Sequence, residues 1–261
     1  MEIACYHVDS FAERPFEGNP AGVCLMDEWL DDARLAAIAA EFNLSETAFV
    51  KRNGDGWAIR WFTPVCEVSL CGHATLAAAH VLLNETGAAE GRVDFAAGIG
   101  PLAVTATSSG RLELDFPSRP GRPAAPHPDL AAALGAEPDE VLLGEDLMCV
   151  YGDEADVRGL APDMDRLARV PGRGVIVTAP GADCDFVSRF FGPKVGVPED
   201  PVTGSAHTML TPYWARRLER AELSARQLSA RGGRLRVRDR GDRVGIAGGA
   251  VTVMAGTLRL P

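Results

Sequence analysis

The sequence of 261 residues lacks three features that would each assign it to a class of proteins. It has no excess of positive charge, because its net charge is −10 and a nucleic-acid surface needs a concentrated basic footprint. Its longest apolar run, within residues 76–83, is too short for a membrane span. The six cysteines show no paired metal spacing, and no charged-then-apolar signal segment precedes Cys5.

These absences predict a protein that binds no nucleic acid, membrane or metal and that works in the cytoplasm with reduced thiols. A composition of 46% hydrophobic and 24% charged residues is typical of a soluble globular protein and excludes disordered and fibrous classes. The length allows one or two domains with a large core.

The most informative stretch is VSLCGHATLAAAHVLL, at residues 68–83. It predicts a short strand, a turn at Gly72 and then a helix that is small or apolar on all sides and therefore buried. Unpaired backbone N–H groups at the start of such a helix, together with the positive end of its dipole, can bind an anionic group such as a carboxylate.

The same pattern recurs 132 residues later, which is close to half the chain: Gly204-Ser205-Ala206-His207-Thr208 repeats Gly72-His73-Ala74-Thr75. We therefore predict two equivalent halves, each with a buried helix aimed at a shared cleft. The segment Pro117–Pro128 is the most linker-like in the chain, which divides it into residues 1–117 and 118–261, with the last strand able to cross to the first half.

Both halves alternate many short strands with one long internal helix, unlike the regular rhythm of a doubly wound sheet. This predicts an α+β fold in which each half is a curled sheet wrapped around its helix. A further helix is predicted from Asp31 and Asp32 to Asn43, because apolar residues recur there at helical spacing, and two short helices are predicted at residues 129–134 and 164–168.

Two acidic residues are candidates for chemistry. Glu46 shares a strand face with Ala48 and Val50, where poor solvation would raise the pKa of its carboxyl towards the range of a general acid or base. Asp200 precedes a proline that keeps it extended, next to a helix start where Thr203 or Ser205 can cap and Gly204 admits a ligand. The alternatives are a solvated glutamate at a strand start and an ordinary capping turn.

Cys71 and His73 flank Gly72 at the first helix start. A helix N-terminus lowers the pKa of a thiol, so that Cys71 could be a carbon-acid base and His73 could donate to the substrate or relay a proton. The alternatives are a small buried cysteine and a capping histidine. Under the 132-residue offset Cys71 falls on Thr203, whose hydroxyl is too weakly acidic to replace a thiolate, and this disfavours a racemase with two thiol bases.

Several long segments, in the same order, resemble the PhzF-like family of phenazine-biosynthesis isomerases, which are relatives of diaminopimelate epimerase and proline racemase. The resemblance covers essentially the whole chain. The segments that carry it are VDSF, FEGNPAGVCL, FNLSETAFV, CGHATLAAAHVL, LDFP, DFVSRFF, PEDPVTGSAHT, ARQLSARGG and GIAGGAV.

The resemblance implies a diaminopimelate-epimerase-like fold of two pseudo-symmetric halves with the active site between them, and a homodimer. Glu46 matches the family's catalytic glutamate, which moves a proton between carbons of a small-molecule substrate without a cofactor. His73 and Asp200 match its assisting polar residues. The positions that match those lining the substrate site are Gly72, Gly204 and Ser205.

Our leading hypothesis is therefore a cofactor-independent isomerase that shifts a proton within a small carboxylate-bearing substrate. Phenazine-producing members of the family isomerise a dihydro-hydroxyanthranilate, whereas this motif set resembles a broader branch. Two alternatives are a racemase or epimerase that depends on Cys71, and a non-catalytic protein that binds a small molecule.

Overall fold

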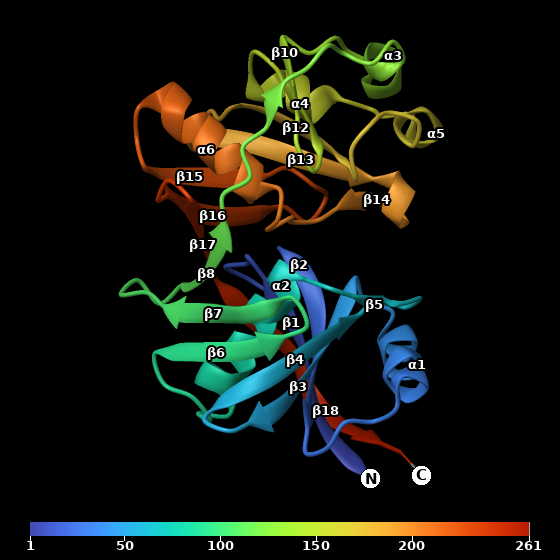
Figure 1. Cartoon of the computed structure of the whole chain (residues 1–261), viewed down its shortest axis with the longest axis vertical. Helices are drawn as coiled ribbons and strands as arrows, with labels where there is room; N and C mark the ends of the chain where they lie inside the picture. Colours follow the sequence, from blue (N-terminus) through green and yellow to red (C-terminus); the bar gives the residue numbers. More distant parts are fainter. Residues whose placement is uncertain (261) are drawn as a thin grey trace. The chain divides into compact units, whose positions relative to one another are not determined.

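The computed structural model describes residues 1–260 and shows a mixed α+β fold, as predicted from the alternation of strands and helices. The chain forms two compact units (Figure 1). The first contains residues 1–115 and the C-terminal segment from residue 247, and the second contains residues 116–246. The sequence-based boundary places residues 118–261 in the second half. The C-terminal segment belongs to the first unit because β18 (Ala250–Arg259) pairs with β1 (Glu2–Ser10) along its length.

The first unit is a curled sheet in which β18, β1, β2, β3, β4, β6, β7 and β8 are neighbours in that order. The pairs β2–β3 and β4–β6 are parallel, and the other pairs are antiparallel. The remaining bounds are β2 (Asn19–Met26), β3 (Glu46–Asn53), β4 (Gly56–Phe62), β5 (Glu67–Val68), β6 (Arg92–Ala97), β7 (Gly100–Ala106) and β8 (Leu112–Pro117).

Helix α2 (Gly72–His80) lies within the curl of this sheet (Figure 1). It packs against β1, β2, β3, β7 and β18, and every residue from His73 to His80 is buried. A π-helical turn, Val81–Glu85, continues it. The helix is thus buried on all sides, as its apolar sequence predicts. Because alanines fill much of its surface, the sheet can approach the helix closely.

Helix α1 (Asp32–Phe42) confirms the prediction at both ends. The side chain of Asp31 accepts a hydrogen bond from the backbone N–H of Arg34, and Asn43 ends the helix in the left-handed conformation with φ of 50°. The residues Leu35, Ile38 and Ala39 form its buried face. They pack in a core with residues of β1, β2, β3 and β4.

In the second unit, β9 to β13 are neighbours in the order β9, β10, β11, β12, β13, and β13 also pairs with β14 and β15. Strand β15 pairs with β16. The bounds are β9 (Arg122–Pro123), β10 (Glu140–Leu143), β11 (Leu147–Val150), β12 (Val175–Pro180), β13 (Phe186–Gly192), β14 (Val197–Asp200), β15 (Glu222–Gln227), β16 (Gly233–Asp239) and β17 (Arg243–Gly248).

Helix α6 (His207–Leu218) is the long helix of the second unit and contacts β15 and β16. The Trp214 ring stacks on Phe186 of β13 with ring centroids 5.6 Å apart, and its indole N–H donates to the hydroxyl of Thr178 at 2.9 Å. This contact fixes the rotation of α6 about its axis. Its N-terminal residues therefore reach the turn that follows β14.

Short helices cover other strands of this unit. Helices α3 (Leu130–Leu134) and α5 (Met164–Leu167) confirm the predictions for residues 129–134 and 164–168, while α4 (Glu154–Gly159) was not predicted. Its signal is a capping box in which Asp153 and Asp156 each accept from the other's backbone N–H. Within residues 1–260, no helix is long and apolar enough to cross a membrane.

The tight enclosure of α2 predicts a large effect of added volume. We expect Ala78→Leu to lower the free energy of unfolding by about 1–3 kcal/mol, since Ala78 is fully buried and the sheet surrounds it. Ala40→Leu on the exposed face of α1 is the matched control and should change the free energy by less than about 0.5 kcal/mol. Urea unfolding of both variants measures the difference, and equal effects would contradict the enclosure of α2.

Candidate functional site

Glu46 is the first residue of β3, and the sheet positions its side chain beside the start of α2. Ala48 and Val50, two and four residues further along, are fully buried on the same strand face. The Glu46 side chain is 21% exposed, so its carboxylate lies at the rim of the core and retains access to solvent. Most of the Glu46 side chain is therefore buried, as expected for a residue on this strand face.

The start of α2 is held from both sides. Cys71 precedes the helix in an extended conformation, with φ of −141° and ψ of 113°, and Gly72 opens it. The Thr75 hydroxyl donates back to the carbonyl of Cys71 at 2.5 Å, which closes the first turn. The buried Ser10 hydroxyl donates to the carbonyl of His73 at 2.7 Å and ties this turn to β1.

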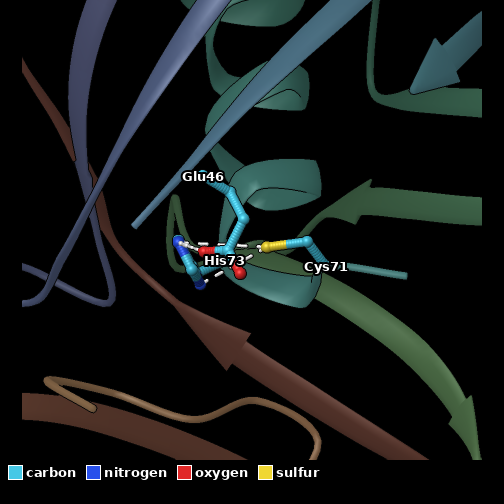
Figure 2. A group of neighbouring side chains, drawn as sticks. All are labelled: Glu46, Cys71 and His73. Carbon is cyan, nitrogen blue, oxygen red and sulfur yellow. Dashed lines mark hydrogen bonds and ion pairs between the residues drawn. The ribbon is translucent and has the colours of Figure 1, made fainter. Parts of the chain in front are cut away.

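Glu46, Cys71 and His73 form one cluster (Figure 2). The Nε2 atom of His73 lies 3.2 Å from Oε2 of Glu46, and the Sγ atom of Cys71 lies 3.6 Å from Nδ1 of His73. The carboxylate, the imidazole and the thiol therefore each contact the other two groups. The tertiary structure brings together two predicted catalytic residues, Glu46 and His73, and adds Cys71 to them.

The prediction of a raised pKa for Glu46 was wrong. Burial does raise the pKa of this carboxyl, but the positive charge of His73 and hydrogen bonds from His73 and Cys71 outweigh it, and the net pKa is lowered. Glu46 is therefore an ionised carboxylate at neutral pH. The sequence argument counted the desolvation of the strand face and could not include a partner 27 residues away.

The opposite shift occurs at His73. Burial lowers the pKa of its imidazole, but the negative charge of Glu46 and hydrogen bonds to Glu46 and Cys71 raise it well above the ordinary value of 6.5. Because His73 side-chain exposure is only 8%, solvent screens this interaction weakly. At neutral pH the cluster thus holds an imidazolium against a carboxylate.

The expected activation of Cys71 by the helix N-terminus was also wrong. Burial and the negative charge of Glu46 raise the pKa of the Cys71 thiol to about 11, although the charge of His73 opposes this rise. A thiol that lies in the core and next to a carboxylate stays protonated at neutral pH. Cys71 therefore serves as a hydrogen-bonding neighbour of the ion pair.

The cluster also contains the ligand types of a transition-metal site. One ligand atom from each of Glu46, Cys71 and His73 lies within 4.8 Å of the others. Carboxylate, thiolate and imidazole are ligands that zinc accepts. Such an ion would have to displace the Glu46–His73 ion pair and deprotonate a thiol whose pKa is raised.

The other predicted residues, Asp200, Gly204 and Ser205, lie in the second unit at the turn between β14 and α6. The Thr203 hydroxyl donates to Oδ2 of Asp200 at 2.5 Å. The buried side chain of Gln227 spans the turn: it donates to the Asp200 carbonyl at 2.7 Å and accepts from the backbone N–H of Thr203 at 2.9 Å. Asp200 is therefore fixed at both its main chain and its carboxylate.

Neither predicted cap is used at this helix start. The residue before α6 is Ala206, which has no side-chain cap, whereas the Thr203 hydroxyl bonds Asp200 and the Ser205 hydroxyl accepts from Arg173 at 3.0 Å. Helix α6 starts three residues after Gly204, since residues 204–206 form a turn first. The capping prediction was wrong because local spacing does not reveal side-chain partners from β14 and the loop before β12.

His207, the histidine of the sequence repeat, belongs to the core. Its Nδ1–H donates to the Thr203 carbonyl at 2.9 Å, and burial lowers the pKa of its imidazole to about 4. A neutral histidine enclosed in this way supports the turn and does not exchange protons near neutral pH. The repeat therefore identifies two helices, although α6 begins three residues later than the repeat indicates, and the histidines of the two motifs differ in kind.

Two residues that form hydrogen bonds with this turn were not among the candidates identified from the sequence: Arg173 and Gln227. Arg173 lies in a loop, and Gln227 ends β15, so neither falls near the motif that contains Asp200. Gln227 does lie in the resemblance-bearing segment ARQLSARGG, which marks it as part of a recurring pattern. Only the pairing of β13 with β15 places it against the turn.

Known proteins are similar to this chain over nearly all of its length. The family model described as phenazine biosynthesis-like protein matches residues 8–256. A Pseudomonas aeruginosa protein called an uncharacterized isomerase is 52% identical over 260 residues, which cover 100% of both chains. The crystal structure of a PhzF family phenazine biosynthesis protein from Enterococcus faecalis superposes with a TM-score of 0.97 at 47% identity, and covers 100% of both chains.

The same fold also occurs in a protein of much lower sequence identity. A hydroxyproline epimerase from Agrobacterium vitis superposes with a TM-score of 0.63 at 10% identity, over 98% of this chain and 92% of the epimerase. The predicted diaminopimelate-epimerase-like architecture is thereby confirmed as the fold. The match over almost the whole sequence establishes that the chain belongs to the phenazine biosynthesis-like family and is an isomerase.

Proposed function

We propose that this isomerase shifts a proton between carbons of a small carboxylate-bearing substrate and that Glu46 carries the proton. The supporting observation is the ion pair between Glu46 and His73, with 3.2 Å between carboxylate oxygen and imidazole nitrogen. Because its pKa is lowered, Glu46 is in the basic form that can accept a proton from carbon.

In the proposed reaction, the Glu46 carboxylate removes a proton from one carbon and the bond electrons delocalise into the substrate. His73, as an imidazolium, stabilises the negative charge that develops there. Glu46 then returns the same proton to a second carbon, so that no proton, electron or cofactor is consumed. A positioned acid–base group of this kind typically contributes about 10² to 10⁴ in rate.

The resemblance supports roles for the residues that surround the helix starts. We propose that the backbone N–H of Gly72, at the start of α2, binds a carboxylate of the substrate, since the start of a helix favours anions, and that Gly204 and Ser205 line the substrate site. Asp200 assists as a polar group, held by Thr203 and Gln227. A homodimer and work without a cofactor stay predictions from the same resemblance, and a cytoplasmic location stays a prediction from the cysteines as reduced thiols.

Two alternative functions make different demands on the cluster. A racemase that depends on Cys71 needs a thiolate, which the raised pKa of about 11 disfavours at neutral pH. A non-catalytic binding protein needs no proton carrier, whereas the partly buried Glu46 is paired with a protonated partner in a way that suits proton transfer.

The role of Glu46 can be tested by isotope exchange. Wild-type protein is incubated in deuterated water with cyclic and linear amino and hydroxy acids, and deuterium at carbon is measured by mass spectrometry. We expect Glu46→Gln to lower the exchange rate at least about 100-fold, since the amide cannot accept the proton. Glu41→Gln, on α1, is the matched control and should exchange as wild type. Full activity of Glu46→Gln would refute the assignment.

The pH dependence follows from the two shifted pKa values. Activity needs ionised Glu46 and protonated His73, so kcat/KM should stay level through neutral pH. It should fall below the lowered pKa of Glu46 and above the raised pKa of His73. In His73→Gln only burial and the weaker Cys71 contact act on Glu46, so the pKa of its carboxyl rises and the acid limb moves to higher pH. An acid limb that stays in place would contradict the coupling.

The two cysteines near this site should differ in reactivity. Cys66 is exposed, whereas Cys71 is buried with a pKa of about 11. At pH 7.5 we expect iodoacetamide to alkylate Cys66 at least about ten times faster, and Cys71→Ala to keep most of the exchange activity. Peptide mapping by mass spectrometry measures the alkylation rates. Loss of exchange in Cys71→Ala, with folding intact, would favour the thiol-dependent racemase.

A further inference from the structure

Arg173 is held rigidly in the loop that precedes β12. Its Nε and Nη2 atoms donate to the two carboxylate oxygens of Asp146 at 3.0 and 2.9 Å. The Asp146 side chain is 4% exposed and also accepts from the backbone N–H of Gly174 at 3.1 Å. The guanidinium carbon lies 5.3 Å from the centre of the Phe190 ring. A two-pronged ion pair with a buried carboxylate fixes the plane of the guanidinium.

The same Nη2 atom also contacts Ser205, at 3.0 Å from its hydroxyl oxygen. A guanidinium can only donate hydrogen bonds, so the Ser205 oxygen is the acceptor in this contact. Within residues 1–260 the Ser205 hydroxyl has no other partner, which leaves its hydrogen available. In the segment from Val202 to Leu210, Ser205 is the one residue that is not buried.

We propose that Arg173 is a positioning residue that makes Ser205 a hydrogen-bond donor to the substrate, so that the group bound there is an acceptor oxygen of a carboxylate or carbonyl. The inference rests on the proposed function in one respect, the placement of Ser205 at the substrate. It adds a chemical selectivity, because an ammonium group has no lone pair to accept from the hydroxyl.

Neighbouring carboxylates largely balance the charge of Arg173. Its proposed role therefore differs from electrostatic attraction of an anion. Asp146 neutralises the guanidinium at contact distance, and a carboxylate oxygen of Glu145 lies 4.0 Å away. Arg173 therefore contributes by fixing the direction in which the Ser205 hydroxyl donates its hydrogen bond. Its removal would let the Ser205 hydroxyl rotate and donate within the protein, which weakens its bond to a ligand.

The test is a double-mutant cycle on ligand binding. Calorimetry measures the dissociation constants of two carboxylates, proline and anthranilate, and of the amines that lack the carboxyl group, pyrrolidine and aniline. We expect wild type to bind at least one carboxylate more tightly than the amine without its carboxyl group. Arg173→Met and Ser205→Ala should each weaken that carboxylate about ten- to a hundredfold, as expected for loss of a hydrogen bond that involves a charged group. The double variant should be no weaker than Ser205→Ala, since Arg173 acts through the hydroxyl.

Three control variants separate this role from a structural one. Arg166→Met removes an exposed arginine paired with Asp163 and should leave binding unchanged. Arg173→Met leaves the buried Asp146 carboxylate without its ion-pair partner. If that variant folds poorly, Arg173→Met combined with Asp146→Asn, which removes this carboxylate, should fold and show the expected loss of carboxylate binding. Glu46→Gln should keep carboxylate binding, so that a failure of proton exchange and a failure of this proposal give different results.

Several results would overturn the proposal: no binding of either carboxylate to wild type, equal weakening in Arg173→Met of a carboxylate and of the amine without its carboxyl group, or losses that add in the double variant. Unchanged binding in both single variants would do the same. Carboxylate binding that depends on Arg173 and Ser205 without any proton exchange would support this role for Ser205 and refute the proposed isomerisation.

Discussion

The ion pair between Glu46 and His73 is the interaction on which the site depends, and it requires a helix buried on every side. Helix α2 can lie inside the curl of the first unit because its surface is made of alanines and a few larger apolar residues. That position sets His73, in the first turn, against the start of β3. The Ser10 and Thr75 hydrogen bonds hold the turn, so the distance between carboxylate and imidazole is determined by the sheet and not by the local sequence.

Burial affects the three groups of the cluster differently because only two of them can form an ion pair. Burial by itself favours the neutral form of each group: it raises the pKa of Glu46 and Cys71 and lowers that of His73. Opposite charges at 3.2 Å reverse this for Glu46 and His73. Cys71 then faces a carboxylate in a poorly solvated place, and it stays neutral. One proton donor, one base and one neutral thiol thus arise from a single arrangement.

In the second unit, buried polar side chains also hold the turn before α6 in place. Buried side chains support partly exposed residues there: Gln227 holds the main chain at Asp200, and Asp146 holds Arg173, which in turn donates to Ser205. A buried amide or ion pair is rigid because breaking it leaves unsatisfied groups in the core. Such support keeps the orientation of residues that face solvent constant. The same support explains why Thr203 and Ser205 do not cap the helix.

Much of the fold could be predicted from local pattern, because local pattern controls its main elements. The caps Asp31 and Asn43 delimit α1, and the apolar run after Gly72 identifies α2 as a buried helix. The short helix α4 escaped prediction since it has few residues and one buried apolar side chain, Val157. The membership of β18 in the first unit depends on its pairing with β1, at the other end of the chain.

The sequence by itself determined the α+β class, the two repeated helix starts and, through its motifs, the candidates Glu46, His73, Asp200, Gly204 and Ser205. Only the tertiary structure decided the protonation states of Glu46, His73 and Cys71, because a pKa depends on charges that the fold brings close from distant positions. It also supplied Gln227, which strand pairing places against the turn, and Arg173, whose role comes from its hydrogen bonds to Asp146 and Ser205. Residue type and period are local properties, whereas electrostatic partners and hydrogen-bond directions are set by packing.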